Sequence, residues 1–213
     1  MTRGILAFEG VANSGKTTLA RELEGDRFAV IGEIFDVFDV PVYDCFDDEE
    51  RHNSDMWFVS TECRRWETAR ELATERVAVM DRCVLSQIVH IRTRFDVFRQ
   101  TTNRSVWTQM KDSFRTGRLG FPDAIVIFSS LHGSRDPSPH LYQSEAFIAR
   151  ASEIYDLLLQ EFPGLMYLDL NRIDGGMDRS ALVVNALSTP GAPPTVEALE
   201  SLLEIRRCIA GYE

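Results

Sequence analysis

Lysine is nearly absent from this chain, and so are the features that would indicate a membrane or a polyanionic partner. Only Lys16 and Lys111 carry ammonium groups, so arginine supplies almost all of the positive charge, and 33 acidic residues face 23 basic ones. The formal charge of −10 argues against non-specific binding to nucleic acids or to anionic membranes. No apolar run approaches the roughly 20 residues that a membrane-spanning helix needs.

Metal and redox patterns of cysteine are also missing. Cys45, Cys63, Cys83 and Cys208 show no C-x-x-C spacing, which argues against a zinc site or a redox pair. Residues 1–9 lack the pattern of a signal peptide, because an apolar strand there runs straight into a glycine-rich turn. We therefore expect a cytoplasmic protein with reduced thiols, and 213 residues suit one globular domain with a proper core.

The most informative stretch is residues 3–18, RGILAFEGVANSGKTT. It contains the phosphate-binding pattern G-x-x-x-x-G-K-[ST] between a short apolar run and a helix-forming segment. Such glycines let the backbone curl so that its N–H groups point at a polyphosphate, and the following helix adds its positive N-terminal end. We predict ATP as the bound nucleotide, held by Gly10, Asn13, Ser14, Gly15, Lys16, Thr17 and Thr18.

Three side chains have predicted roles around the phosphates. Lys16 would act as a catalytic residue on the β- and γ-phosphates, and the Thr17 hydroxyl would help to hold Mg²⁺. Asp81 follows the apolar run 77–80, at the strand end where parallel sheets present ligand groups, so its carboxylate could hold the same ion. Alternatively, Asp81 could cap a helix that begins near residue 83.

Short apolar segments alternate with helical segments along the chain. This alternation is typical of an α/β fold in which helices cover both faces of a parallel sheet, here of five strands. The predicted strands are residues 5–8, 28–31, 77–80, 124–128 and 165–170. The predicted helices are residues 17–24, 55–74 with Asp55 as the N-cap, 83–98, 102–115, 141–162, 178–187 and 195–208.

Arginine side chains are predicted near the transferred phosphate. Arg82 lies beside Asp81 at the sheet edge, where its planar fork suits a phosphate and where burial without a partner would be costly. Arg64 and Arg65 lie on the preceding helix, and Arg135 lies in a polar, turn-rich stretch that suits a lid. Phosphoryl transfer depends on such charge because its catalysis is positioning and electrostatic stabilisation.

Several of these motifs resemble those of the thymidylate kinase and deoxynucleoside kinase branch of P-loop kinases. Residues 8–10 and 15–18 resemble the F-E-G-x-x-x-x-G-K-[ST]-T opening of thymidylate kinases. Residues 65–67 resemble their R-W-E, and residues 81–82 with Ser86 resemble their D-R-x-x-x-S. The resemblance implies a P-loop NTPase kinase fold, with ATP and Mg²⁺ as cofactors.

The sequence pattern predicts that residues 1–187 form the kinase domain with a lid near 131–140, and residues 188–213 a linker and a C-terminal helix packed on it. The resemblance, which covers roughly residues 3–170, also implies roles for single residues. Four residues would bind the acceptor in addition to Glu33. Arg82 would hold its phosphate with Ser86 beside it, and Arg64 or Arg65 would contact its base or phosphate. Arg135 would act from the lid on the transferring phosphoryl group. Related kinases pair through helices near the D-R motif, which implies a homodimer.

Other positions depart from the thymidylate kinase pattern. Ala12 replaces an acidic residue of the loop, Cys83 replaces the tyrosine after D-R, and residues 90–91 replace a later Tyr-Gln. Deoxynucleoside kinases instead place a glutamate after the second strand as general base on the sugar hydroxyl, and Glu33 occupies that place. A carboxylate within reach of the hydroxyl could orient and deprotonate it, whereas at a strand end it could equally be a surface acid.

These observations predict an ATP-dependent phosphotransferase that moves the γ-phosphoryl group to a small acceptor, either a nucleoside monophosphate or a deoxynucleoside. The departures at the acceptor positions leave open a kinase of a non-nucleotide metabolite or antibiotic. A nucleotide-binding regulatory switch ATPase is a further alternative, although the sequence shows no clear water-positioning or switch motif.

Overall fold

The computed structural model describes residues 3–12, 14–34, 47–128, 144–168, 179–188, 191 and 193–211. Asn13, Arg135 and the predicted lid at 131–140 lie outside the described residues. No helix in the described ranges is long and apolar enough to cross a membrane.

A sheet of five parallel strands forms the centre of the protein, in the order β2-β3-β1-β5-β6. The strands are β1 (Gly4–Gly10), β2 (Phe28–Ile31), β3 (Val77–Asp81), β5 (Ala124–Phe128) and β6 (Leu165–Leu168). The predicted α/β fold is therefore confirmed. The strand order reverses on the two sides of β1, and in open parallel sheets ligands bind beyond the carboxyl ends of the strands at such a point.

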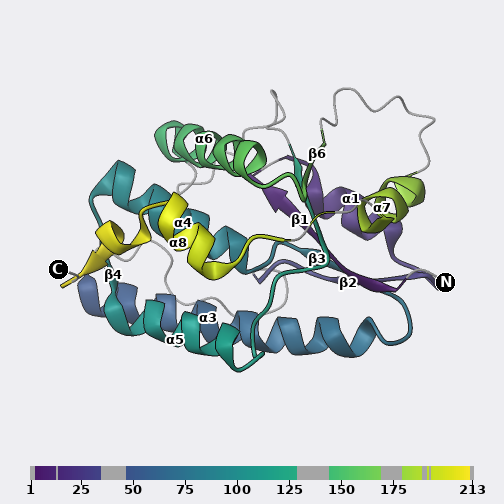
Figure 1. Ribbon diagram of the computed structural model, residues 1–213, viewed down its shortest axis with the longest axis horizontal. Coiled ribbons are helices and arrows are strands. Elements are labelled where there is room, and N and C mark those ends of the chain that lie inside the picture. Colours follow the sequence, from purple (N-terminus) through teal and green to yellow (C-terminus); the bar gives the residue numbers. More distant parts are fainter. Residues whose placement is uncertain are drawn as a thin grey trace.

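Helices cover both faces of this sheet (Figure 1). Residues of β1 alternate between two cores: Leu6 and Phe8 belong to one, and Ile5 and Ala7 to the other. The first core includes α1 and α7, and the larger second core includes α3, α4, α5, α6 and α8. The described helices are α1 (Lys16–Leu23), α3 (Asp48–Leu72), α4 (Val84–Phe98), α5 (Arg104–Arg115), α6 (Glu145–Glu161), α7 (Arg179–Ser188) and α8 (Val196–Leu202).

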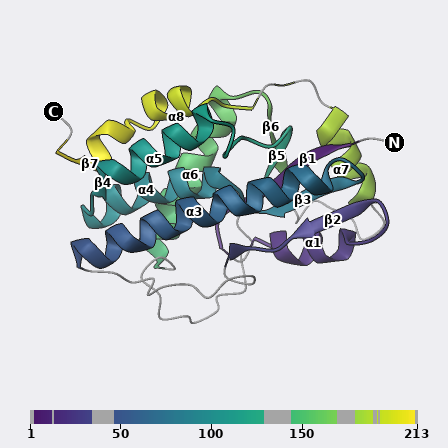
Figure 2. The same cartoon turned by 90° about the horizontal axis from the view of Figure 1, so that it is seen from below.

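Helix α3 runs across the molecule and begins earlier than predicted (Figure 2). Asp47 is its N-cap, and its side chain accepts hydrogen bonds from the backbone N–H of Glu49 and Glu50 at 2.8 and 3.1 Å. The prediction of Asp55 as the N-cap was therefore wrong. Asp55 is instead buried and forms a bidentate ion pair with Arg94 of α4, with N–O distances of 2.9 and 2.6 Å.

The C-terminal segment also differs from the single helix predicted for residues 195–208. Helix α8 ends near Leu203, Glu204 adopts a left-handed φ of 48°, and a 3-10 turn follows at Ile205–Cys208. The chain then forms β7 (Ile209–Ala210), which pairs in parallel with β4 (Thr102–Asn103). The pairing of β4 with β7 also explains why α5 begins at Arg104 and not at residue 102.

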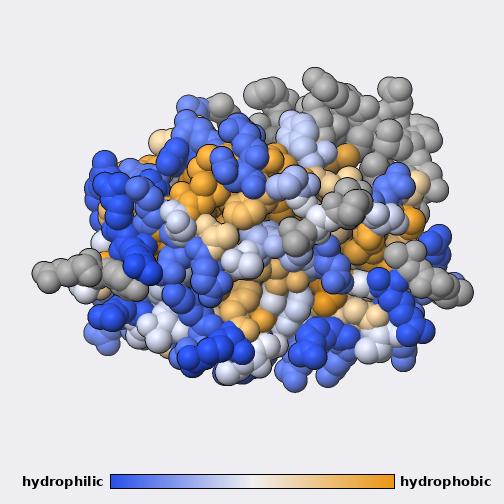
Figure 3. Space-filling model, viewed as in Figure 1, coloured by the Kyte–Doolittle hydropathy of each residue, from blue (hydrophilic) through white to orange (hydrophobic). Residues whose placement is uncertain are grey.

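Apolar side chains gather on the surface between α6 and α8, with hydrophilic side chains around them (Figure 3). Half-buried residues of the larger core, among them Ile148 and Leu202, belong to these helices. Among the described residues, Tyr167 of β6 is the one large hydrophobic side chain that is exposed.

Candidate active site

The phosphate-binding loop begins where β1 ends. Gly10 has a φ of 126°, and a Cβ atom at this position would lie 2.6 Å from the backbone oxygen of Phe128. Gly15, with a φ of 86°, is the N-cap residue of α1. Only glycine fits both conformations without strain, so these two positions fix the curl of the loop against β5 and α1.

Lys16 is buried inside this loop. Its Nζ donates hydrogen bonds to the backbone oxygen of Val11 at 2.6 Å and to Oγ of Ser14 at 2.9 Å. Burial and the nearby Arg82 lower the pKa of Lys16 to about 7, while Glu33 and Asp81 act in the opposite direction. The ammonium group is thus held at the centre of the predicted phosphate site.

Asp81 ends β3 close to the loop and is almost completely buried. Its two carboxylate oxygens accept no well-formed hydrogen bond within the described part of the chain. Burial raises the pKa of Asp81, which the hydroxyl of Thr17 opposes. A buried carboxylate beside a threonine hydroxyl is a donor set that suits Mg²⁺, so the predicted ligands Thr17 and Asp81 fit that ion. Thr18, the next loop residue, is exposed.

Arg82 and Glu33 form an ion pair beside this loop. Nε of Arg82 lies 2.5 Å from Oε1 of Glu33, and both side chains are about one-fifth exposed (21% and 22%). Nη1 of Arg82 also donates to the backbone oxygen of Gly10 at 2.9 Å and to Oγ of Ser86 at 3.4 Å. The structure thus brings three predicted site residues, Glu33, Arg82 and Ser86, to the start of the phosphate-binding loop.

Arg65 is buried below these residues and binds the backbone. Its Nη2 donates to the backbone oxygens of Gly32, Asp81 and Arg82 at 3.0, 2.7 and 3.1 Å, and Nη1 pairs with Glu62. These contacts fix the carboxyl ends of β2 and β3, the two strands that lead to Glu33 and Arg82. Arg64, by contrast, is exposed on α3 and donates to Oγ1 of Thr61 at 3.2 Å.

Glu9 is a site residue that the sequence reasoning did not single out. Its side chain is fully buried, and Oε1 accepts hydrogen bonds from the backbone N–H of Cys83 and Ser86 at 2.8 and 3.3 Å. Glu9 thereby caps the N-terminus of α4 from β1, and the alternative role of Asp81 as the cap of this helix was wrong. The available signal in the sequence was the position of this glutamate, directly after the apolar run of residues 5–8 and before Gly10.

The loop, the strand order and the residues at the strand ends together define a P-loop kinase fold. No family model matches the chain, and no curated protein matches it in sequence. Solved structures do match, and they confirm the predicted resemblance to thymidylate kinases and deoxynucleoside kinases at the level of the fold.

Three of these structures show how far the likeness extends. Thymidylate kinase from Candida albicans is 14% identical, with a TM-score of 0.60 over 87% of this chain and 90% of that chain. Deoxyadenosine kinase from M. mycoides with bound dCTP is 13% identical, with a TM-score of 0.52 over 86% and 98%. The NadR protein in complex with NR is 17% identical, with a TM-score of 0.54 over 91% and 54%.

Proposed function

We propose that the protein transfers the γ-phosphoryl group of ATP to a hydroxyl group of a nucleoside, such as a deoxynucleoside. The observation that carries this proposal is the pair of Glu33 and Arg82 beside the phosphate-binding loop, with 2.5 Å between Nε and Oε1. A general base has to lie within reach of the hydroxyl that it deprotonates, and Glu33 lies at the carboxyl edge of the sheet, where acceptors bind.

The charge of Glu33 favours a neutral acceptor group over a phosphate. Two nitrogens of the Arg82 guanidinium already contact Glu33 and the backbone of Gly10. A monophosphate entering here would have to approach the carboxylate of Glu33, and two anions at close range repel each other. A hydroxyl group instead meets a hydrogen-bond acceptor that Arg82 holds in place.

The proposed reaction makes one bond and breaks one. The acceptor oxygen forms a bond to the γ-phosphorus while the bond from that phosphorus to the bridging oxygen of ADP breaks. The hydroxyl proton passes to a carboxylate oxygen of Glu33, and the products are ADP and a nucleoside phosphate. Arg82 and Lys16 would stabilise the charge of the transferring group, and such stabilisation is the main source of catalysis in these reactions.

Thr17 and Asp81 would hold Mg²⁺ in this proposal. The ion, when bound, neutralises phosphate charge and polarises the phosphoryl group. The loop backbone and the ammonium group of Lys16 would bind the nucleotide phosphates, because the hydrogen bonds from Lys16 to Val11 and Ser14 show that it points along the inside of the loop. Arg135 and the lid at 131–140 remain predictions.

A nucleoside monophosphate is the second candidate acceptor. The likeness to a thymidylate kinase, with its TM-score of 0.60, supports it, and so does the position of Arg82 at the strand end. In this case Arg82 would release Glu33 and grip the acceptor phosphate with its fork.

An ATP-consumption assay with Mg²⁺ over paired nucleosides and nucleoside monophosphates tests the proposal. We expect one nucleoside to stimulate turnover, and Glu33→Gln to lower kcat by roughly 10²–10⁴-fold as loss of a general base does. Glu71→Gln makes the same change at an exposed position of α3 and serves as the matched control. Stimulation by monophosphates alone, with Glu33→Gln still active, would support the second candidate instead.

A further inference from the structure

We propose that Glu9 is a positioning residue for Arg82: its buried carboxylate joins β1, α4 and α6 and holds the Arg82 side chain in its working orientation. This inference rests on the proposed function, because Arg82 matters for catalysis only if the site transfers phosphate. Glu9 itself is fully buried, so it would act through Arg82 and not on the acceptor directly.

Four hydrogen bonds converge on the carboxylate of Glu9. Oε1 accepts from two backbone N–H groups at the N-terminus of α4, and Oε2 accepts from Oγ of Ser86 at 2.5 Å and from the hydroxyl of Tyr155 at 3.0 Å. No lysine or arginine forms an ion pair with Glu9 among the described residues. The positive end of α4 and the two hydroxyl groups therefore compensate its charge.

Ser86 carries the effect of Glu9 to the Arg82 side chain. A serine hydroxyl has one proton, and in this geometry Ser86 donates it to Glu9. The lone pairs of the same oxygen then face Nη1 of Arg82, which lies 3.4 Å away. Without Glu9 the hydroxyl of Ser86 could rotate, and the contact between Ser86 and Nη1 of Arg82 would be lost.

Contacts from β1 also stabilise the backbone conformation of Arg82. Arg82 has a φ of 66°, a left-handed conformation that is strained for a residue with a long side chain. It is held from both sides by β1, since its own N–H donates to the backbone oxygen of Phe8 at 2.9 Å and the N–H of Cys83 donates to Glu9. Glu9 therefore stabilises the turn that projects Arg82 toward Glu33.

Tyr155 fixes Glu9 from the side of α6. It is buried, and burial together with Glu9 raises its pKa well above the ordinary value, so its hydroxyl stays protonated and donates to the carboxylate. Glu9 immediately precedes Gly10, so one carboxylate links the first residue of the phosphate-binding loop to α4 and to α6.

A double-mutant cycle separates positioning from simple structural support. Glu9→Gln keeps an oxygen for the backbone N–H groups but removes the charge, and we expect it to lower kcat/KM for the acceptor by roughly 10–100-fold with the KM for ATP within about twofold. In an Arg82→Ala background the same change should have an effect below about threefold, because the group that Glu9 positions is gone. Equal losses in both backgrounds, or equal losses for ATP and acceptor, would overturn the proposal.

A second measurement does not depend on activity. In protein labelled with ¹⁵N-arginine, the Nε–Hε resonance of Arg82 is assigned by its disappearance in Arg82→Lys. We expect this resonance to shift in Glu9→Gln, Ser86→Ala and Tyr155→Phe. It should not shift in the matched controls Tyr167→Phe and Ser105→Ala, which make the same changes at exposed positions.

An unchanged Arg82 resonance in all three variants would contradict the proposal even if their activity fell. If the unaltered protein phosphorylates no nucleoside, the proposed function fails, while the resonance still shows whether Glu9 orients Arg82. The two claims can therefore fail separately.

Discussion

Arg82 is the residue at which most of the site's contacts meet. Its guanidinium contacts Glu33, Gly10 and Ser86, and its backbone has a positive φ. Strained backbone persists where surrounding contacts hold it, and it gathers at functional sites. The same small region contains the loop and the buried carboxylate of Asp81, so Arg82 is where a substitution should affect catalysis more than stability.

Glycine at the end of β1 allows a first prediction. Gly10→Ala places a Cβ 2.6 Å from a backbone oxygen at a φ of 126°, so we expect it to lower the free energy of unfolding by about 3 kcal/mol. Gly117→Ala is the matched control: its φ is 73°, but nothing lies within 4 Å of the new Cβ, so the cost should be about 1 kcal/mol. Urea unfolding measures both, and similar costs would contradict the close approach of β1 to β5.

The buried pair of Asp55 and Arg94 allows a second prediction. Arg94→Met leaves the buried Asp55 carboxylate without its bidentate partner, which should cost about 3–5 kcal/mol. Adding Asp55→Leu removes the unpaired charge, so the double variant should recover part of that loss. A loss below about 1 kcal/mol in urea unfolding of Arg94→Met would show that the pair does not bear on stability.

Local patterns made some site residues predictable from the sequence, and distant partners kept others hidden. Gly10, Gly15 and Lys16 belong to one short motif whose spacing specifies the loop. The role of Glu9 depends on Tyr155, 146 positions away, and no local pattern reveals that contact. The roles predicted for Arg64, Arg65 and Ser86 stay predictions, although the structure shows that Arg65 binds backbone oxygens.

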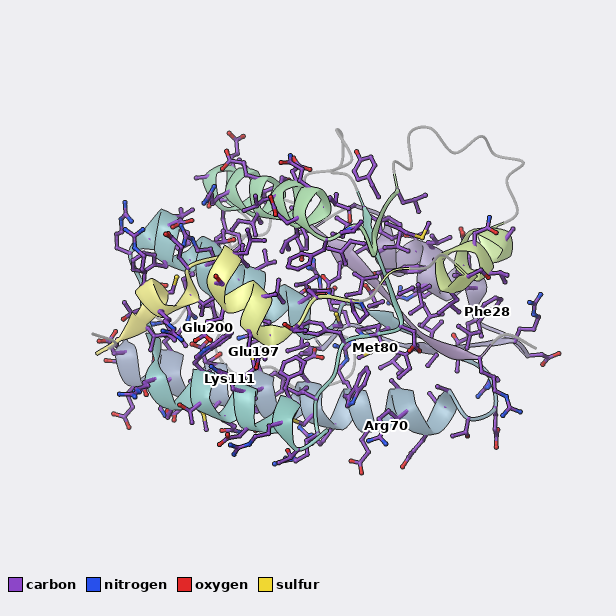
Figure 4. All side chains as sticks on the ribbon, viewed as in Figure 1. Phe28, Arg70, Met80, Lys111, Glu197 and Glu200 are labelled. Atoms are coloured by element: carbon purple, nitrogen blue, oxygen red, sulfur yellow. The ribbon has the colours of Figure 1, made fainter. Side chains whose placement is uncertain are left out.

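At the scale of elements, the C-terminal segment packs on α4 and α5. Oε1 of Glu200 in α8 accepts a hydrogen bond from Nε1 of Trp107 at 3.0 Å, and its Oε2 lies 2.9 Å from Nζ of Lys111 (Figure 4). Nη1 of Arg92 in α4 donates to the backbone oxygen of Leu203 at 2.6 Å. Buried and half-buried polar contacts therefore hold the C-terminal segment on α4 and α5, beside the pairing of β4 with β7.

Glu200 gives this packing a pH dependence. Burial alone would raise the pKa of Glu200, but hydrogen bonds from Lys111 and Trp107 lower it below the ordinary value of 4.5. A carboxylate with a lowered pKa contributes stability above its unfolded-state pKa and loses it as the pH falls through the folded-state pKa. We therefore expect Glu200→Gln to destabilise the protein at pH 7, and the difference in urea midpoint to shrink below pH 4.5. A difference that is constant from pH 7 to 4 would contradict this role.

The strands were predictable because each is a short apolar run. The runs of β1, β3 and β5 are buried almost throughout, as the central strands of a parallel sheet require. The boundaries of the helices were harder to predict from the sequence. The start of α3 was missed because the acidic residues of its first turn resemble a solvated rim, although negative charge stabilises a helix N-terminus. The 3-10 turn and β7 depend on Glu204 and on pairing with a distant strand, and the sequence around them reads as one helix.

At the scale of the whole molecule, the strand order places the candidate site. Because β1 lies between β3 and β5, the loop after β1 and the residues that end β2 and β3 meet at one edge of the sheet. Residues as distant as Glu33 and Arg82 thus come together from separate strands. The position of the site in the fold follows from the alternation of strands and helices. The identity of the acceptor does not, because single side chains would make the contacts with it.

Magnesium removal tests the site as a unit. Thr17 and Asp81 are the proposed ligands, so EDTA should abolish acceptor-dependent ATP consumption, and added Mg²⁺ should restore it. Asp81→Asn should raise the Mg²⁺ concentration needed for half-maximal activity by roughly 10-fold or more, because a neutral amide replaces a hard anionic ligand. Full activity in excess EDTA would contradict the proposed role of the ion.

The most direct test of the central claim is the ³¹P NMR spectrum of the reaction with ATP, Mg²⁺ and the acceptor that stimulates turnover. If Glu33 activates a hydroxyl group, ADP should form together with a new phosphomonoester, and Glu33→Gln should suppress that signal. A product with phosphorus–phosphorus coupling beyond that of ADP would show that a monophosphate is the acceptor. Inorganic phosphate alone would show hydrolysis without transfer and would contradict the kinase account altogether.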